Sequence, residues 1–250
     1  MTTESAPLER LLSKWHVASR TAARALITAG RVRVAGAVCT DPRRWVDPAL
    51  EPVALDDSPI APARGELVHL ALNKPRGVIA TTHDPDGRRT VMDLVPRPVA
   101  PGLAPAGRLD RASAGLLLLT NDHALAALLL NPASHVTKVY RVKVRGHPTD
   151  ASLARLCEES IVDDGIALGP MDVRVESCGP RSAWLEVALR EGKNRQIRRR
   201  LADVGHTVEH LIRIAFGPIA LGDLAPGAVR TLHVDEVAAL RASAGHAGRR

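Results

Sequence analysis

Apolar positions recur at helical spacing in the N-terminal part of the chain. Pro7 suits a first helical position, and one helix face is formed by Leu8, Leu11, Leu12 and Trp15. Ser19 can cap a second helix, which Gly30 is expected to end. Residues 31–34 then alternate between basic and apolar, turn at 35–36 and return through 37–38. The pattern predicts a small module of two helices followed by a hairpin, over residues 7–55.

Between residues 56 and 65 the periodic pattern stops. This stretch is rich in proline, alanine and aspartate, and Pro59 and Pro62 are expected to prevent regular structure. It is therefore interpreted as a linker between the N-terminal module and a larger domain at 66–240. The basic segment 241–250 is expected to be a disordered tail.

The larger domain mixes strand-like and helix-like patterns. Strands are predicted at 67–72, 116–119, 138–144, 171–176 and 183–189, from apolar runs or from alternation. Helices are predicted at 124–130, capped by Asn121 or Asp122, and at 151–159, capped by Asp150. Leu153, Leu156 and Cys157 are expected to face inward. The fold class expected for the whole chain is α+β.

Charge narrows the range of partners. The chain has 250 residues, is 45% hydrophobic, and carries 34 Lys and Arg against 27 Asp and Glu, with a pI near 10.0. A polyanion, nucleic acid before an anionic membrane, is the expected partner. No apolar run approaches the roughly 20 residues that span a bilayer, and the start lacks a signal-peptide pattern, so a cytoplasmic location is expected. The three cysteines are interpreted as small buried apolar residues.

The segment from Gly107 to Asp122 has the strongest chemical character. Asp110 lies between Arg108 and Arg111, which would keep its carboxylate ionised, as a nucleophilic or electrostatic carboxylate must be. Taken from charges alone, a surface Asp-Arg pair beside a turn is the simpler interpretation.

Three further segments carry clustered cations. Glu191-Gly192 leads into a helix with Ile197, Leu201 and Val204 on its apolar side, and the remaining faces carry Arg195, Arg198, Arg199 and Arg200. The turn at 74–77 could aim Lys74 and Arg76 at phosphate, or be a plain surface turn. Arg20, Arg24, Arg31 and Arg33 converge on the N-terminal module and are predicted to contact RNA phosphates.

Gly107-Arg108-Leu109-Asp110, with Ser113, Gly115 and the run from Leu116 to Asp122, closely resembles the signature of the ribosomal RNA pseudouridine synthases that carry an N-terminal S4 domain. The resemblance extends over about residues 7 to 232. It implies an S4-like RNA-binding domain joined to a catalytic domain with a mixed, mainly antiparallel sheet. Departures from the family pattern are His123, where glycine is common, and His210, where arginine often stands.

The resemblance also implies site residues. Asp110 would be the indispensable catalytic residue, Tyr140 would stack on the target base and is a candidate for proton transfer, and Arg198 would pair with Asp110. Arg108 would fill the space left by the flipped nucleotide. The RNA-binding residues predicted from the motifs and the resemblance are Arg20, Arg24, Arg31, Arg33, Lys74, Arg76, Arg108, Lys138, Lys193, Asn194, Arg195, Gln196 and Arg199.

The function that the resemblance implies is conversion of uridine to pseudouridine in ribosomal RNA, with a preference for the large subunit suggested by residues 138–146. No cofactor and no metal site are expected: Asp84 to Gly87 is interpreted as a turn, and His206 and His210 as flanks of a strand. The partner would be ribosomal RNA or a pre-ribosomal particle, and the protein a monomer. The alternative is a catalytically silent ribosome-assembly factor that uses the same basic surfaces only to bind.

Overall fold

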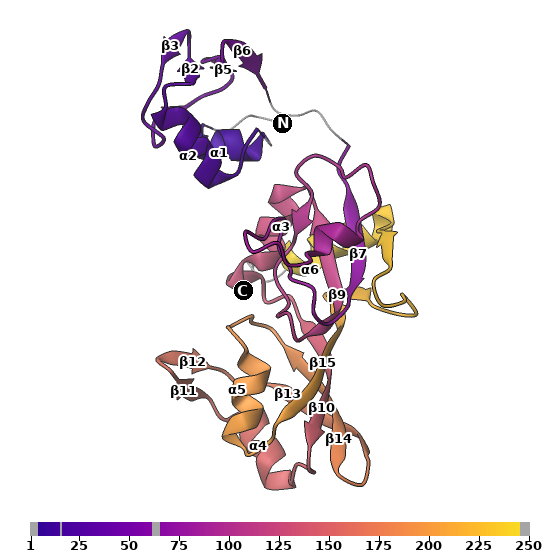
Figure 1. Cartoon of the computed structure of the whole chain (residues 1–250). Coiled ribbons are helices and arrows are strands. Elements are labelled where there is room, and N and C mark those ends of the chain that lie inside the picture. The colour runs from indigo at the N-terminus through magenta and orange to yellow at the C-terminus, as the bar shows by residue number, and fades with distance from the viewer. Residues whose placement is uncertain (1–4, 16, 62–65, 246–250) are drawn as a thin grey trace. The chain divides into compact units, whose positions relative to one another are not determined.

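The computed structural model describes residues 5–15, 17–61 and 66–245, and it divides into two compact units (Figure 1). The first comprises residues 1–66 with Ala100–Gly102, and the second comprises Leu67–Val99 and Leu103–Arg250. None of the described helices is long and apolar enough to cross a bilayer.

The N-terminal unit packs two helices against short strands. Helices α1 (Leu8–Lys14) and α2 (Arg20–Thr28) lie with a sheet of order β3-β2-β5-β6, formed by Ala37–Val38, Val32–Val34, Val53–Leu55 and Ser58–Ile60. Strand β1 (Ala6–Pro7) pairs with β4 (Trp45–Val46), so Pro7 is a strand residue and not the first helical one. The predicted apolar face is buried, and the Ser19 hydroxyl accepts a hydrogen bond from the Ala22 amide at 3.2 Å. The predicted helices and hairpin are confirmed.

The linker prediction needs a correction. Asp56 and Asp57 form a turn with positive φ values of 48° and 63°, and this turn joins β5 to the additional strand β6. Pro59 lies inside β6, which is an edge strand, where a missing amide hydrogen leaves no ladder bond unmade. The N-terminal sheet therefore continues to Ile60, and residues 62–65 lie outside the described residues.

In the second unit, nine of the described strands form one mixed, mainly antiparallel sheet, as predicted. Its main path is β13-β14-β10-β15-β9-β7-β17, with β16 on β15 and β8 on β9. The bounds are β7 His69–Lys74, β8 Ala104–Pro105, β9 Ala114–Thr120, β10 Lys138–Arg145, β13 Asp172–Cys178, β14 Ser182–Leu189, β15 Val208–Phe216, β16 Ile219–Ala220 and β17 Val229–Thr231. Strands β11 (Ile161–Asp163) and β12 (Ile166–Leu168) form a separate hairpin, and Val91–Leu94 and Pro132–Ser134 are 3-10 turns.

Helices bury the sheet at both of its ends. Helices α3 (His123–Leu130) and α6 (Val234–Gly245) pack on the part formed by β7 and β9, whereas α4 (Asp150–Glu158) and α5 (Gln196–Asp203) pack on the part formed by β10, β13 and β14 (Figure 1). Each part has its own apolar core. The two parts are joined in the middle of the sheet, where β15 pairs with β10 on one side and with β9 on the other.

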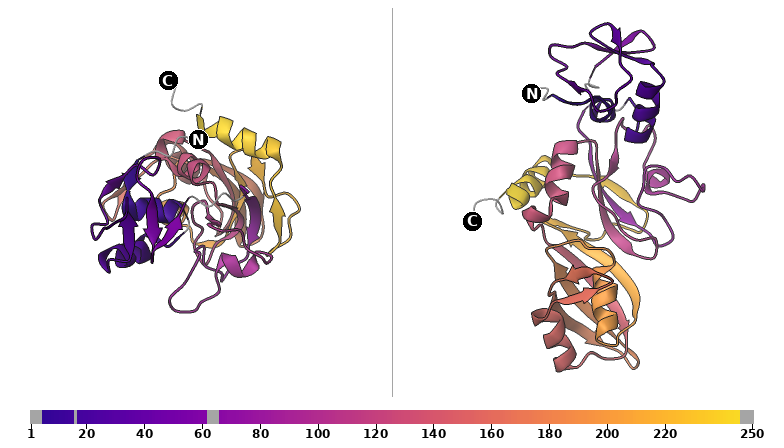
Figure 2. Two further views of the ribbon diagram at one scale, coloured as in Figure 1. Left: turned by 90° about the horizontal axis from the view of Figure 1, so that it is seen from above. Right: turned by 90° about the vertical axis from the view of Figure 1, so that its left-hand side faces the viewer.

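Several local predictions are corrected by the structure. Of the two predicted caps of α3, Asn121 and Asp122, the structure shows Asp122. Helix α4 is capped by Thr149 and not, as predicted, by Asp150. Cys39 is buried, whereas Cys157 and Cys178 are exposed. The helix α6 lies beside α3 (Figure 2) and extends to Gly245, so residues 241–245 are not a tail. Arg241 of α6 forms an ion pair with Asp122 at the start of α3.

Gly115 explains how the sheet joins the predicted catalytic segment. Strands β9 and β15 run parallel, with Gly115 opposite Arg213. The φ of Gly115 is 102°, and a Cβ there would lie 2.3 Å from the Arg213 carbonyl oxygen. Only glycine fits this close approach. It therefore fixes the segment that carries Asp110 against strand β15.

Candidate active site

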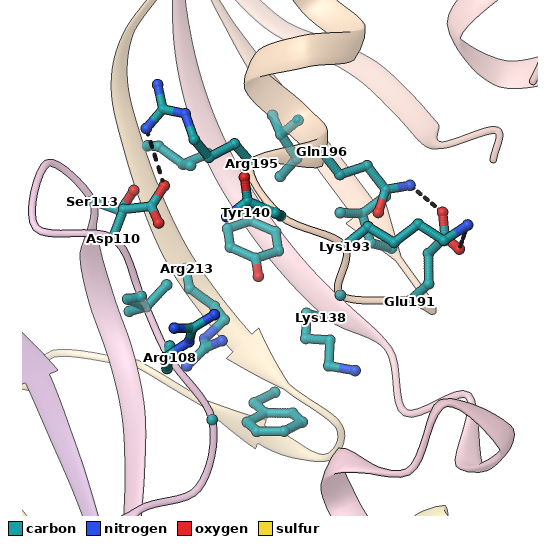
Figure 3. Close-up of a pocket in the computed structure, with 18 of the residues that line it drawn as sticks. Arg108, Asp110, Ser113, Lys138, Tyr140, Glu191, Lys193, Arg195, Gln196 and Arg213 are labelled. Carbon is teal, nitrogen blue, oxygen red and sulfur yellow. Dashed lines mark hydrogen bonds and ion pairs between the residues drawn. The ribbon is translucent and has the colours of Figure 1, made fainter. Parts of the chain in front are cut away.

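A cleft of about 560 Å³ lies where the two parts of the second unit meet (Figure 3). Its walls come from the loop before β9, from β10 and β15, and from the segment that leads into α5. Asp110, Tyr140, Lys138, Arg195 and Arg213 all line it. The cleft therefore brings together side chains from the separate motifs of the sequence.

Asp110 lies on the turn that precedes β9. The Ser113 amide donates to the Asp110 carbonyl at 2.9 Å, which closes this turn. Its carboxylate is 40% exposed, and its ion pair is with Arg195, whose Nη1 lies 3.4 Å from Oδ2. Arg108 and Arg111, its sequence neighbours, make no ion pair within the described part of the chain. The carboxylate is thus compensated by a residue 85 positions away and not by the adjacent arginines.

The expected pairing of Arg198 with Asp110 is not present. Arg198 Nη1 instead donates to the Val208 carbonyl at 3.2 Å, on the side of α5 toward β15. Burial lowers the pKa of Arg198, Arg195 lowers it further, and the charge of Asp110 opposes both. Arg195, the left-handed residue that precedes α5 with a φ of 51°, makes the direct contact with Asp110. Arg198 contributes charge from greater distance.

Lys74 does not point toward a phosphate, contrary to the prediction. Its side chain is fully buried, and Nζ donates to the carbonyls of Ser113 at 2.7 Å and Pro75 at 3.1 Å. Burial lowers the pKa of Lys74 to about 8, with Asp110 opposing this shift. Lys74 is therefore a support beneath the turn that carries Asp110. Arg76 remains exposed, with Nη1 3.4 Å from Nδ1 of His210.

The segment before α5 is held internally. Lys193 pairs with Glu191 at 2.8 Å, and the buried Gln196 donates to the same carboxylate. Asn194 is exposed at the cleft. In α5, Arg199 pairs with Asp163, and Arg200 is buried with Nη2 bonded to the carbonyls of Arg155, Leu156 and Glu159. Gln196, Arg199 and Arg200 thus make contacts within the protein. Fewer basic side chains of α5 are free to bind RNA than the sequence predicted.

The arginines predicted to bind RNA in the N-terminal unit all have acidic partners. Arg20 and Arg24 pair with Glu9, Arg31 with Asp56, and Arg33 with Asp57. Glu9 is buried, and the hydrogen bonds from Arg24 and then Arg20 lower its pKa to about 2.

Tyr140 and Lys138 lie on the cleft side of β10, as the alternation of that strand predicted (Figure 3). The sequence analysis did not identify two cleft residues of β15. Arg213 and Phe216 line the cleft, whereas their segment was predicted only to be a strand, with no role in the site. The available signal was an arginine within the apolar run Leu211-Ile212-Arg213-Ile214, where a buried charge needs a reason.

No group of three or more metal-binding side chains gathers among the described residues. The segment at Asp84 is the predicted turn, with the Gly87 amide bonded to the Asp84 carbonyl at 3.2 Å and Arg88 bound to the Asp84 carboxylate. His206 Nδ1 lies 3.0 Å from the Arg145 carbonyl, at the rim of the sheet.

Comparison with known proteins agrees with this architecture. Residues 68–203 match the RNA pseudouridylate synthase family, and residues 7–50 match the S4 domain. An uncharacterized RNA pseudouridine synthase of Mycobacterium tuberculosis is 40% identical over 241 residues, which cover 95% of this chain and 94% of that protein. Ribosomal large subunit pseudouridine synthase B of Bacillus subtilis is 34% identical over 241 residues, covering 96% and 97%.

A solved structure described as a pseudouridylate synthase shares the fold, with a TM-score of 0.66 at 23% sequence identity, covering 93% of this chain and 98% of that one. The expected division into an S4 domain and a catalytic sheet domain is thus found both in the sequence matches and in the fold. The chain belongs to the RNA pseudouridylate synthase family, among the members that carry an N-terminal S4 domain.

Proposed function

We propose that this synthase acts on ribosomal RNA of the large subunit, with Asp110 as its catalytic carboxylate. The observation that carries the proposal is the Asp110–Arg195 pair in one cleft with Tyr140. The end-to-end match to a B. subtilis enzyme named for the large ribosomal subunit supports the choice of substrate.

A base inside folded RNA must leave its stack before an enzyme can reach the ribose. The cleft offers an aromatic ring, Tyr140, for the extruded uracil to stack on. The Arg195 guanidinium lies 3.4 Å from the Asp110 carboxylate and holds it in the cleft, where the chemistry needs a carboxylate whether it attacks C1′, attacks C6 or assists a glycal route. Arg108, exposed at the cleft, is proposed to occupy the space left by the nucleotide.

The isomerisation balances without a cofactor. The N1–C1′ bond breaks and a C5–C1′ bond forms, while C5 loses one proton and N1 gains one. Asp110 leaves unchanged, and no electron is gained or lost overall. Arg198 adds positive charge near Asp110 without contacting it.

The test is Asp110→Asn, which keeps the size of the side chain and removes its charge. We expect pseudouridine formation on ribosomal RNA fragments to fall by at least about 10⁴-fold under single-turnover conditions, because nucleophilic or charge stabilisation is lost. RNA affinity should change by less than about 3-fold, since one exposed carboxylate contributes little to binding phosphates. If the wild-type protein binds ribosomal RNA but forms no pseudouridine, the assembly-factor alternative replaces the enzyme.

The choice of subunit has a separate test. Pseudouridines should be mapped in both ribosomal RNAs from cells with and without this protein. Loss of a site confined to the large-subunit RNA would support the proposal, and loss in the small-subunit RNA would contradict it. A ribosomal substrate would also place the enzyme in the cytoplasm, where we propose that it acts as a monomer.

A further inference from the structure

Arg213 is a buried cation that contacts no carboxylate within the part of the chain that the structure describes. It is only 4% exposed, and its Nε donates to the Leu116 carbonyl of β9 at 2.7 Å. Its Nη2 is buried and has no hydrogen-bond partner among the described residues. A buried guanidinium nitrogen left unpaired costs free energy, so its retention requires either a ligand or another gain. Because Arg213 also lines the cleft, a ligand in that cleft can supply the missing acceptor.

A second cation reaches the same place. Lys138 is opposite Phe216 in the β10–β15 ladder, and Tyr140 is opposite Arg213. Lys138 Nζ lies 5.4 Å from the centre of the Phe216 ring, and the Arg213 guanidinium carbon lies 5.1 Å from it. Lys138 has no acidic partner among the described residues, and its pKa is lowered by burial and then by Arg213. Two positive charges therefore share one aromatic ring, and no acid within the described ranges forms an ion pair with either of them.

The depth at which Arg213 and Lys138 lie in the cleft indicates which part of a nucleotide they contact. Asp110 is half-buried and Arg195 is exposed, whereas Arg213 and Phe216 are buried, with only 4% and 1% of their surface exposed. The ribose and its phosphates continue into the RNA chain on both sides and must stay near the opening. Only the base can extend into a nearly closed end. With its ribose at Asp110, the uracil ring would lie along Tyr140 and direct an edge toward Arg213 and Lys138 (Figure 3).

We infer that Arg213 and Lys138 bind a carbonyl oxygen of the extruded uracil and stabilise the negative charge that develops on it. The inference rests on the proposed function. When the N1–C1′ bond breaks, its electron pair stays with the base, and the charge spreads from N1 to the uracil oxygens while C1′ bonds to Asp110 or loses a C2′ proton. If the carboxylate adds to C6 instead, the charge again reaches O4. Donors fixed where charge develops, in a site closed to water, act in the transition state.

The test uses Arg213→Gln, because the glutamine amide nitrogen takes the place of Nε. It can still donate to the Leu116 carbonyl while the two terminal nitrogens are removed. We expect the single-turnover rate to fall about 100-fold, with RNA affinity within about 3-fold of wild type. Lys138→Met, a half-buried position with no polar partner among the described residues, should lower the rate in the same manner but less. Arg145→Met, at the exposed end of β10, is the matched control and should change neither quantity.

A purely structural role is separated by changing the substrate atom. The RNA carries uridine, 2-thiouridine or 4-thiouridine at the target position, since sulfur accepts hydrogen bonds poorly. Sulfur at the contacted position should slow the wild-type enzyme about 10-fold more than it slows Arg213→Gln. Equal sulfur effects in both proteins would overturn the inference. A further RNA carries a methylphosphonate at the target nucleotide, which removes the charge of that phosphate. If the methylphosphonate, and not the sulfur, slows the wild-type enzyme more than it slows Arg213→Gln, the inference is overturned and Arg213 binds the RNA backbone.

These outcomes are distinct from failure of the proposed function. If the wild-type protein forms no pseudouridine, the proposed function itself is wrong. If it forms pseudouridine and Arg213→Gln retains the wild-type rate and thermal midpoint, only the role of Arg213 and Lys138 is wrong.

Discussion

The N-terminal unit and the cleft differ in how many of their predicted RNA-binding cations have acidic partners; in the cleft Arg195 and Lys193 have them and others do not. In the N-terminal unit the four arginines predicted to bind RNA all contact carboxylates, from Glu9, Asp56 and Asp57. In the cleft, Arg108, Lys138 and Arg213 have no acidic partner among the described residues. A count of basic residues would rank the two surfaces as similar. The difference in their partners indicates that the cleft is prepared for a negative ligand before RNA arrives.

The acids of the N-terminal unit are themselves of two kinds. Glu9 is buried and holds Arg20 and Arg24 in place while more than half of each arginine side chain stays exposed. Asp56 and Asp57 are exposed, and pairs of that kind contribute little to stability. Phosphate can replace an exposed carboxylate at low cost. Glu9 is thus expected to orient its arginines, whereas the two aspartates compete with RNA for theirs.

Lys74 gives the largest expected effect in this comparison. It is a buried cation that supports the turn of Asp110 through the Ser113 carbonyl and lies within the electric field of that carboxylate. We expect Lys74→Met to lower the single-turnover rate about 100-fold, because small displacements of a catalytic group are costly. The measurement is pseudouridine formation across pH 6 to pH 10, compared as the ratio of wild-type to variant rates.

That ratio should fall as the pH rises through about 8, where Lys74 loses its charge. Titration of the substrate affects both proteins and cancels in the ratio. The free energy of unfolding should change with pH in the opposite direction. Because the pKa of Lys74 is about 8 in the folded chain and 10.5 in the unfolded chain, the folded chain binds this proton less tightly. The contribution of Lys74 to stability therefore rises as the pH increases from about 8 to 10.5. A ratio that stays constant with pH would show that the charge of Lys74 does not act on Asp110.

Local patterns were sufficient where neighbouring residues decide the structure. The apolar face from Leu8 to Trp15, the Ser19 cap and the buried strand after Asp110 were all predicted, since each depends on spacing within one element. The partner of a charge depends instead on which elements pack together. Nothing near Asp110 in the sequence identifies Arg195 rather than Arg198, and nothing near Lys74 shows that it is buried under Ser113.

The same reason explains the missed strand and helix. Pro59 discourages a strand locally, but an edge position beside β5 accepts it. The segment after residue 240 is basic and short, yet the Arg241–Asp122 ion pair and the α3 surface keep it helical to Gly245. The arginine within an apolar strand marks Arg213 as unusual, but only the packing of β15 against β9 and β10 shows that it lines the cleft.

Glu9 gives an intermediate effect. Glu9→Gln keeps the side-chain shape and removes the charge that binds Arg20 and Arg24, so we expect the thermal midpoint of the N-terminal unit to fall by several degrees at pH 7. The pKa of Glu9 is lowered from 4.5 to about 2, so its contribution is complete above pH 4.5 and is lost as the pH falls through about 2. The gap between wild type and variant should close over that range.

The thermal midpoint of the N-terminal unit can be measured by tryptophan fluorescence in a Trp184→Phe background. In that background Trp15 and Trp45, both in the N-terminal unit, are the remaining tryptophans of the sequence. A gap that is constant from pH 7 to pH 2 would mean that the role of Glu9 does not depend on its charge.

The smallest effect is expected from the exposed acids. Asp56→Asn with Asp57→Asn keeps a residue type that accepts the positive φ of this turn, and it releases Arg31 and Arg33. RNA affinity should rise about 2-fold to 5-fold, with a steeper dependence on salt concentration, because two arginines become free to displace counterions. Asp41→Asn with Asp47→Asn is the matched control: it removes two negative charges from the same unit, and these aspartates accept from the Arg43 and Ala49 amides rather than from an arginine side chain. Equal gains in the control and the test variant would attribute the effect to net charge alone. A loss of affinity would mean that these aspartates orient their arginines, as Glu9 is expected to do, and the distinction between the two kinds of acid would fail.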